Sequence, residues 1–185
     1  MEIVKDRLFS IQNAIADRVS AIVAGRGAWP CHAGCDHCCR HLAAVPVMSG
    51  AEWELLTVGL DALPEARRRH IEARIRRMEA AARPYTCPML DTHTGQCMVY
   101  AQRPLACRTY GFYVEREAGL YCREIDALAD AGEMKGVVWG SQASIEDKSA
   151  VLGPKRSLLD WFRNSPAKYV SQSDEGSAGS AGALR

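Results

Sequence analysis

Long apolar runs are missing from this sequence, and so is an excess of charge of either sign. No run of apolar residues approaches the roughly 20 that a membrane-spanning helix needs, so we expect no membrane insertion. The 23 lysines and arginines balance the 22 aspartates and glutamates, which gives a formal net charge of +1. This balance argues against binding that is driven by nucleic acid or by a charged membrane surface.

A secretory signal and the short motifs of common enzyme classes are also missing. The residues from Met1 to Arg7 include charged side chains and no apolar segment, so we expect a cytoplasmic location. The sequence contains no GxGxxG, P-loop, HExxH or GxSxG pattern. No pair of carboxylates stands out as an acid and a base. The residue patterns therefore predict no particular reaction, and whether the protein is an enzyme stays open.

Cysteine, by contrast, is abundant and clustered. Four of the eight cysteines fall within nine residues in the pattern C-x3-C-x2-C-C. In a reducing compartment such a cluster is more typical of metal binding than of disulfides. A chain of 185 residues should also bury about 70% of its unfolded surface, so it can fold without disulfides. The predicted metal ligands are Cys31, Cys35, Cys38, Cys39, Cys87, Cys97, Cys107 and Cys122.

The adjacent pair Cys38 and Cys39 bears on the kind of metal centre. On a helix the four clustered thiols would share about one third of the circumference, and in a loop Gly34 would allow a tight turn. Neighbouring side chains diverge in either case, so the pair serves different metal atoms or one member is not a ligand. An iron–sulfur cluster such as [4Fe–4S] gives each thiolate its own iron. Two zinc ions would also fit, but we favour iron–sulfur.

Other polar residues near the cysteines have two interpretations each. His32, His37 and His41 flank the first block and could add imidazole ligands, but with eight thiols available we expect them at the surface or beside the ligands. Arg103 and Arg108 could donate to sulfur or contact an anionic substrate, or they could bind local carbonyls. Arginines on the predicted helix 64–83 alternate with glutamates, which favours a solvated charged face.

Three cysteine motifs together resemble a known family. They are C-x3-C-x2-C-C from Cys31, C-P-x-L from Cys87, and C-x-V-Y-x-x-R-P-x-x-C-R-x-Y from Cys97 to Tyr110. This combination resembles the YkgJ family of cysteine-cluster proteins, described as a zinc- or iron-chelating domain. The resemblance runs from Cys31 to about Cys122. It implies that the first seven cysteines are the family's metal-binding positions, and that Cys122 matches a later, less constant one.

The same motifs are similar to the cysteine-rich part of the flagellin lysine N-methylase FliB. There an iron–sulfur cluster is associated with methyl transfer from S-adenosylmethionine. That enzyme is much longer than this chain, so the likeness concerns a part of the fold rather than the function.

The expected fold is a small, mainly α single domain over residues 1–170, with its motif core at 31–122. Helices are predicted at 2–24, from the capping box Ser49–Glu52, at 64–83, near 123–132 and near 155–163. At most one short β-hairpin is expected, within 87–100 and with a turn near Gly95, and residues 101–122 should be irregular. The composition of residues 171–185 is typical of a disordered tail.

The function that these observations favour is metal binding. The protein would hold an iron–sulfur cluster or zinc through cysteine thiolates, and it could be an iron–sulfur enzyme of unknown substrate. Three alternatives stay open at this point: a structural zinc-binding interaction module, a methyltransferase related to the lysine N-methylase, and an electron-transfer or metal-handling protein.

Overall fold

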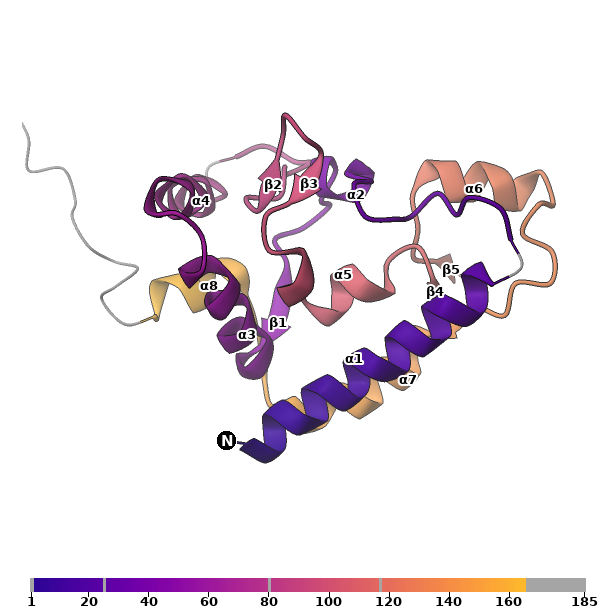
Figure 1. Ribbon diagram of the computed structural model, residues 1–185, viewed down its shortest axis with the longest axis horizontal. Coiled ribbons are helices and arrows are strands. Elements are labelled where there is room, and N and C mark those ends of the chain that lie inside the picture. Colours follow the sequence, from indigo (N-terminus) through magenta and orange to yellow (C-terminus); the bar gives the residue numbers. More distant parts are fainter. Residues whose placement is uncertain (1, 25, 80, 117, 166–185) are drawn as a thin grey trace, which may run out of the picture.

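The computed structural model describes residues 2–24, 26–79, 81–116 and 118–165 (Figure 1). This part of the chain is mainly helical, which confirms the expected fold class. The α-helices are α1 (Glu2–Val23), α2 (His37–Arg40), α3 (Gly50–Asp61), α4 (Glu65–Arg77), α5 (Leu105–Thr109), α6 (Arg123–Asp130), α7 (Gln142–Ser149) and α8 (Leu158–Arg163). Two 3₁₀ turns, η1 (Tyr100–Gln102) and η2 (Ala150–Leu152), complete the helical elements.

Strands form three small sheets, which is more pairing than the one hairpin expected. The strands are β1 (Val47–Ser49), β2 (Leu90–Asp91), β3 (Gln96–Cys97), β4 (Tyr113–Glu115), β5 (Ala118–Gly119), β6 (Gly140–Ser141) and β7 (Lys155–Ser157). The expected hairpin is β2–β3; β1 pairs with β7, and β4 lies between β5 and β6. Strands of two or three residues are too short to show an alternating pattern, which is why the sequence did not reveal the other two sheets.

The first helix follows the prediction closely. Leu8, Ile11, Ile15 and Ile22 recur at helical spacing in the predicted range, and all four are buried. The helix runs along one edge of the molecule in Figure 1 and contacts α3, α5 and α7. No helix in the described ranges is long and apolar enough to cross a membrane.

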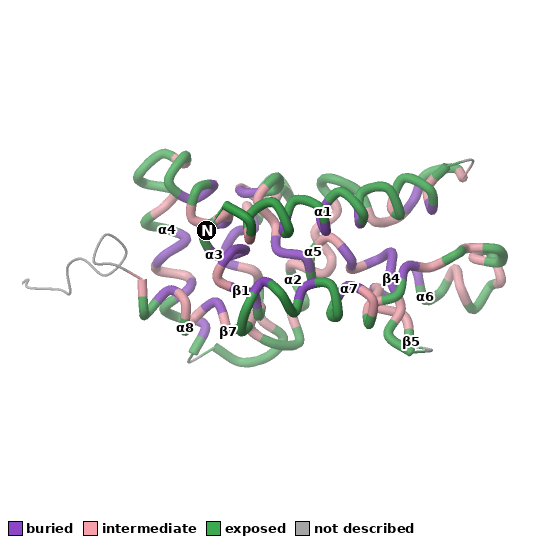
Figure 2. The backbone as a smooth tube through the Cα atoms, turned by 90° about the horizontal axis from the view of Figure 1, so that it is seen from below, coloured by how far each residue is buried: buried purple, intermediate pink, exposed green. Residues whose placement is uncertain are grey.

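Two hydrophobic clusters form the core. The first contains residues of α1, α5, α6 and α7 around Phe112 and Ile125. The second contains residues of α3, α4 and α8 around Leu56 and Ile75. In Figure 1, α3, α4 and α8 lie together at one end and α6 lies at the other, and Figure 2 shows buried segments spread along the whole length. The cysteine-rich segments therefore connect two packed halves.

The start of α3 shows the predicted capping box. The Ser49 side chain accepts a hydrogen bond from the backbone of Glu52, and the Glu52 carboxylate accepts one from the Ser49 backbone at 2.8 Å. The same carboxylate also accepts a hydrogen bond from the backbone amide of Leu105, at 2.9 Å. The capping box thus links α3 to the first residue of α5.

The third helix is shorter than the predicted 64–83. It ends at Arg77, and Pro64 occupies the N-cap position. The predicted apolar residues of this helix are buried as far as Met78, whereas Ala82 is exposed. Beyond the helix, the backbone of Tyr85 pairs with that of Leu42. The chain therefore changes from helix to an extended, paired segment between Arg77 and Tyr85.

Three further expectations about local structure need correction. The segment 101–122 is not irregular, since it contains α5 and the β4–β5 pair. Helix α7 was not predicted, and residues 155–157 form a strand before α8. These elements are too short for a 3.6-residue period to be recognised. The predicted tail at 171–185 lies outside the described residues.

Candidate metal centre

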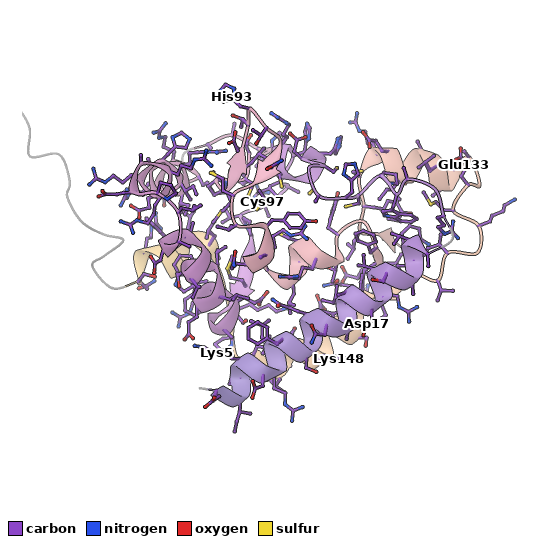
Figure 3. The ribbon with its side chains drawn as sticks, in the orientation of Figure 1. Lys5, Asp17, His93, Cys97, Glu133 and Lys148 are labelled. Carbon is purple, nitrogen blue, oxygen red and sulfur yellow. The ribbon has the colours of Figure 1, made fainter. Side chains whose placement is uncertain are left out.

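One cavity brings together most of the cysteines. It has a volume of about 90 Å³. Four cysteines of a first block (residues 31–39) and three of a second block (residues 87–107) line it: Cys31, Cys35, Cys38, Cys39, Cys87, Cys97 and Cys107. Figure 3 labels Cys97, which belongs to β3, and shows further sulfur atoms around it. The structure therefore joins the two cysteine blocks that lie some fifty residues apart in the sequence.

The first block is part loop and part helix. Cys31 and Cys35 lie in an irregular segment in which Gly34 has a φ of +95°. Cys38 and Cys39 lie in the single turn of α2. Both conformations weighed from the sequence are thus present. The two adjacent cysteines of this helical turn both line the cavity.

Backbone contacts hold the second block against the first. The backbone amide of Cys87 donates to the carbonyl of Cys39 at 2.6 Å, and Leu42 and Tyr85 exchange two hydrogen bonds of 2.9 Å. Arg74 of α4 adds side-chain support, because its guanidinium donates to the carbonyls of Cys87 and Leu90. This arginine was predicted to lie on a solvated face, so its role is a correction. The sequence does not distinguish Arg74 from the other arginines of the helix.

The thiols are close together but do not form a ready-made site for one ion. All eight cysteines are free of disulfides. The Cys38 and Cys39 thiols share a hydrogen bond, and Cys39 shares another with Cys87. Within the described residues, no three His, Cys, Asp or Glu side chains are arranged to hold a single metal ion. Metal binding would therefore require rotation of several thiols toward a common centre.

Burial raises the pKa of the Cys31 and Cys97 thiols above the ordinary value. It raises the pKa of Cys31 to about 12, with help from the neighbouring Cys38 and Cys35. The hydrogen bond to Cys39, together with burial, raises the pKa of Cys38 well above its ordinary value. Burial has the larger effect, but the Arg103 guanidinium opposes it and lowers the thiol pKa of Cys31. Bound metal must displace the protons of these thiols, because the thiolate is the ligand.

The lining of the cavity suits a soft metal. It contains thiols, the imidazole of His32 and apolar side chains such as Leu56 and Met89, and it includes no carboxylate among the described residues. Thiolates select zinc and iron–sulfur clusters, whereas calcium and magnesium need oxygen ligands. The volume is several times the roughly 10–15 Å³ that one bound water needs. The donor set and the space therefore fit either a polynuclear iron–sulfur cluster or a pair of zinc ions.

The eighth predicted ligand, Cys122, lies off the cavity wall, and so do two of the flanking histidines. Cys122 is buried in the first hydrophobic cluster, and its charge contributes to the raised pKa of Cys31, so it lies near the site without lining the cavity. His37 and His41 contact each other with ring centroids 4.8 Å apart. Of the three flanking histidines, only His32 lines the cavity.

Arg103 and Arg108 bind local carbonyls, which is one of the two interpretations given from the sequence. Arg103 donates to the carbonyl of Tyr100 and lies over its ring, with the guanidinium carbon 3.5 Å from the ring centroid. Arg108 donates to the carbonyls of Arg103 and Ala101. Arg103 also lines the cysteine cavity, so it is the positive charge closest to the thiols among the residues that form the wall.

Two residues that support the site were not predicted to do so from the sequence. Glu52 fixes the start of α5, which carries Cys107. Gly111 has a φ of +88°, and a Cβ atom there would lie 2.7 Å from the Cys31 sulfur. The position therefore needs glycine both for its backbone and for the close approach of Cys31. The glutamate of a capping box and a glycine next to a cysteine motif are the only signals that could have found them.

The fold and this lining define a small, mainly α, cysteine-lined protein with the donor set of a zinc or iron site. A family model described as "CxxCxxCC: Putative zinc- or iron-chelating domain" matches residues 30–127. This is more than half of the chain, so the protein belongs to that family, and the resemblance inferred from the motifs is confirmed. The matched range contains all eight cysteines. No curated protein and no solved structure gave a significant match.

Proposed function

We propose that this protein binds an iron–sulfur cluster through the cysteines that line the cavity. The observation that carries the proposal is the placement of Cys38 and Cys39, because these adjacent cysteines line one cavity with room for more than one metal atom. A single tetrahedral ion needs four ligands, and the cavity offers seven thiols. A cluster distributes thiolates over several irons, so it uses this donor set more fully than one ion would.

A structural zinc site is the alternative, and the position of the cavity favours it. The wall includes Leu56 and Leu158 from the second hydrophobic cluster and Cys31 and Tyr110, which pack against the first. A metal at this point would tie the two halves together. Structural zinc sites stabilise folds in this manner.

The two metals are distinguished by composition and colour. The full chain is to be purified without oxygen, its visible absorption recorded, and its iron, acid-labile sulfide and zinc measured on one sample. The proposal predicts a coloured protein with iron and sulfide in similar amounts. A colourless protein with stoichiometric zinc and no sulfide would show that the zinc alternative is correct.

A matched pair of variants tests the ligand set. Cys97→Ala removes a thiol from the cavity wall, and Cys122→Ala removes a thiol that lies nearby but off the wall. We expect the Cys97 variant to lose iron and sulfide and the Cys122 variant to keep them. Circular dichroism of both variants shows whether the fold is retained. Loss of metal only in the Cys122 variant would contradict the proposed ligand set.

A further inference from the structure

A second cavity adjoins the cysteine cavity. Its volume is about 250 Å³, and it shares with the first cavity the residues Cys31, His32, Tyr100, Arg103 and Cys107. On the same measure a bound water needs about 10–15 Å³, so this space admits a molecule of several atoms. A molecule bound there would lie directly beside two of the proposed ligand cysteines.

One wall of the second cavity is apolar. It is formed by α1 residues that follow the cysteine-facing side of the helix, together with Phe112 of the first hydrophobic cluster. The α1 residues are Ile15, Ala16, Val19 and Val23. An apolar wall of this kind favours a ligand with a hydrocarbon part.

The polar groups at the other side are hydrogen-bond donors. Gln12 lines the cavity and is only 8% exposed, and its amide nitrogen has no hydrogen-bond partner among the described residues. Arg103 and Arg108 also line the cavity. Within the described ranges, the ion pairs of the protein involve neither arginine. A buried donor without a partner is costly, and two guanidiniums without a carboxylate favour an acceptor with negative charge.

We propose that the second cavity binds a small organic carboxylate with a short hydrocarbon chain. The carboxylate group would lie at Gln12, Arg103 and Arg108, because it only accepts hydrogen bonds. Its negative charge complements the two guanidiniums, which keep their hydrogen bonds to local carbonyls. The hydrocarbon chain would lie along Ile15 and Val19. Binding of the carboxylate needs only side chains of this protein. That the bound carboxylate is a substrate beside a metal rests on the proposed function.

The binding experiment uses the full chain as purified, with its metal content measured on the same sample. Hexanoate, acetate, hexanol and inorganic phosphate are titrated separately by calorimetry. We expect saturable binding of hexanoate, binding of acetate that is weaker by at least about tenfold because less apolar surface is buried, and no binding of hexanol. Absence of saturable hexanoate binding would overturn the proposal. Tighter binding of phosphate than of hexanoate would overturn the assignment to a carboxylate.

Gln12→Leu is the decisive variant, because leucine has a similar size and lacks the amide. We expect hexanoate affinity to fall by about tenfold, while the melting temperature without ligand is unchanged or higher, since an unpartnered buried amide is removed. Gln142→Leu is the matched control. Gln142 also has a buried side-chain atom without a partner among the described residues, but it starts α7 and does not line the cavity. Equal losses of affinity in both variants, or no loss in Gln12→Leu, would refute the proposal.

The two proposals fail in different ways. A protein that binds hexanoate but never carries metal would support the carboxylate site and contradict the metal centre. A protein that carries iron and sulfide but binds no hexanoate would contradict the carboxylate site alone.

Discussion

Glu52 accepts a hydrogen bond of 2.9 Å from the backbone amide of Leu105, and the same carboxylate closes the capping box of α3 on Ser49. The side chain is only 3% exposed. One carboxylate oxygen accepts from Ser49, and the other accepts from Leu105, which lies fifty-three residues beyond Glu52 in the sequence. Through this contact α3, which belongs to the second hydrophobic cluster, holds the start of the helix that carries Cys107.

Replacement of Glu52 by glutamine should destabilise the fold. The glutamine side chain has one oxygen that can accept and one NH2 group that cannot. At least one of the hydrogen bonds from the backbone amides of Ser49 and Leu105 would therefore be lost. We expect the free energy of unfolding to fall by about 2–3 kcal/mol, measured by urea denaturation. Glu54→Gln is the control, because Glu54 is on the same helix and makes an exposed ion pair with Lys5; its effect should be below about 0.5 kcal/mol. Similar effects in the two variants would show that the Leu105 contact contributes little.

Gly111→Ala should damage the metal centre more than the backbone strain alone predicts. The new methyl group would lie 2.7 Å from the Cys31 sulfur and must displace it. Gly136→Ala separates the two effects, since Gly136 has a φ of +75° but nothing within 4 Å of its Cβ position. Both variants should lose about 1 kcal/mol of stability from the positive φ. Only the Gly111 variant should lose metal, measured as metal bound per chain, and equal metal contents would count against the role of this contact.

Arg74→Gln should loosen the second cysteine block. The guanidinium donates to the carbonyls of Cys87 and Leu90 at 2.7 and 2.6 Å, and glutamine cannot reach both. We expect a loss of about 1–3 kcal/mol and a lower metal content. Arg77→Gln, at an exposed position near the end of the same helix, should change neither quantity. If Arg77→Gln lowers the metal content as much as Arg74→Gln, general charge rather than positioning is responsible.

Metal affinity should rise with pH. Burial raises the pKa of Cys31 to about 12, so this thiol is protonated near neutral pH in the protein without metal. Binding as a thiolate releases the proton, and the apparent zinc affinity should increase about tenfold per pH unit for each proton released. Calorimetry with zinc at about pH 6, 7 and 8, in buffers of different ionisation enthalpy, measures the proton count. Affinity independent of pH would mean that the ligands are already ionised.

The sequence was most informative where a pattern is long or chemically specific. The apolar repeat of α1, the capping box at Ser49 and the turn at Gly95 were all predicted correctly. Long periodic segments and capping side chains act locally, so their consequences can be read without the rest of the chain. The cysteine motifs likewise indicated the correct family, because three motifs with fixed spacing are seldom found together by chance.

The errors concern features that depend on distant residues. The third helix is followed by a chain that pairs through Tyr85 with Leu42. Helix α5 is too short to show a helical period, and its first residue is held by the contact of Leu105 with Glu52. For the candidate site, the convergence of the two cysteine blocks was predicted, but Arg74 and Gly111 were not. Their roles rest on contacts with segments that no local pattern specifies. The prediction that Cys122 is a ligand is still untested, and the Cys122→Ala variant tests it.

Backbone hydrogen bonds join Cys87 to Cys39 and Tyr85 to Leu42, so the two cysteine blocks have contacts that do not involve sulfur. Replacement of one cysteine by histidine or aspartate would leave these bonds unchanged. During evolution, such a scaffold can exchange its donor atoms one at a time without rebuilding its loops. A single backbone can then carry different donor sets, which agrees with a family description that gives zinc or iron as the metal.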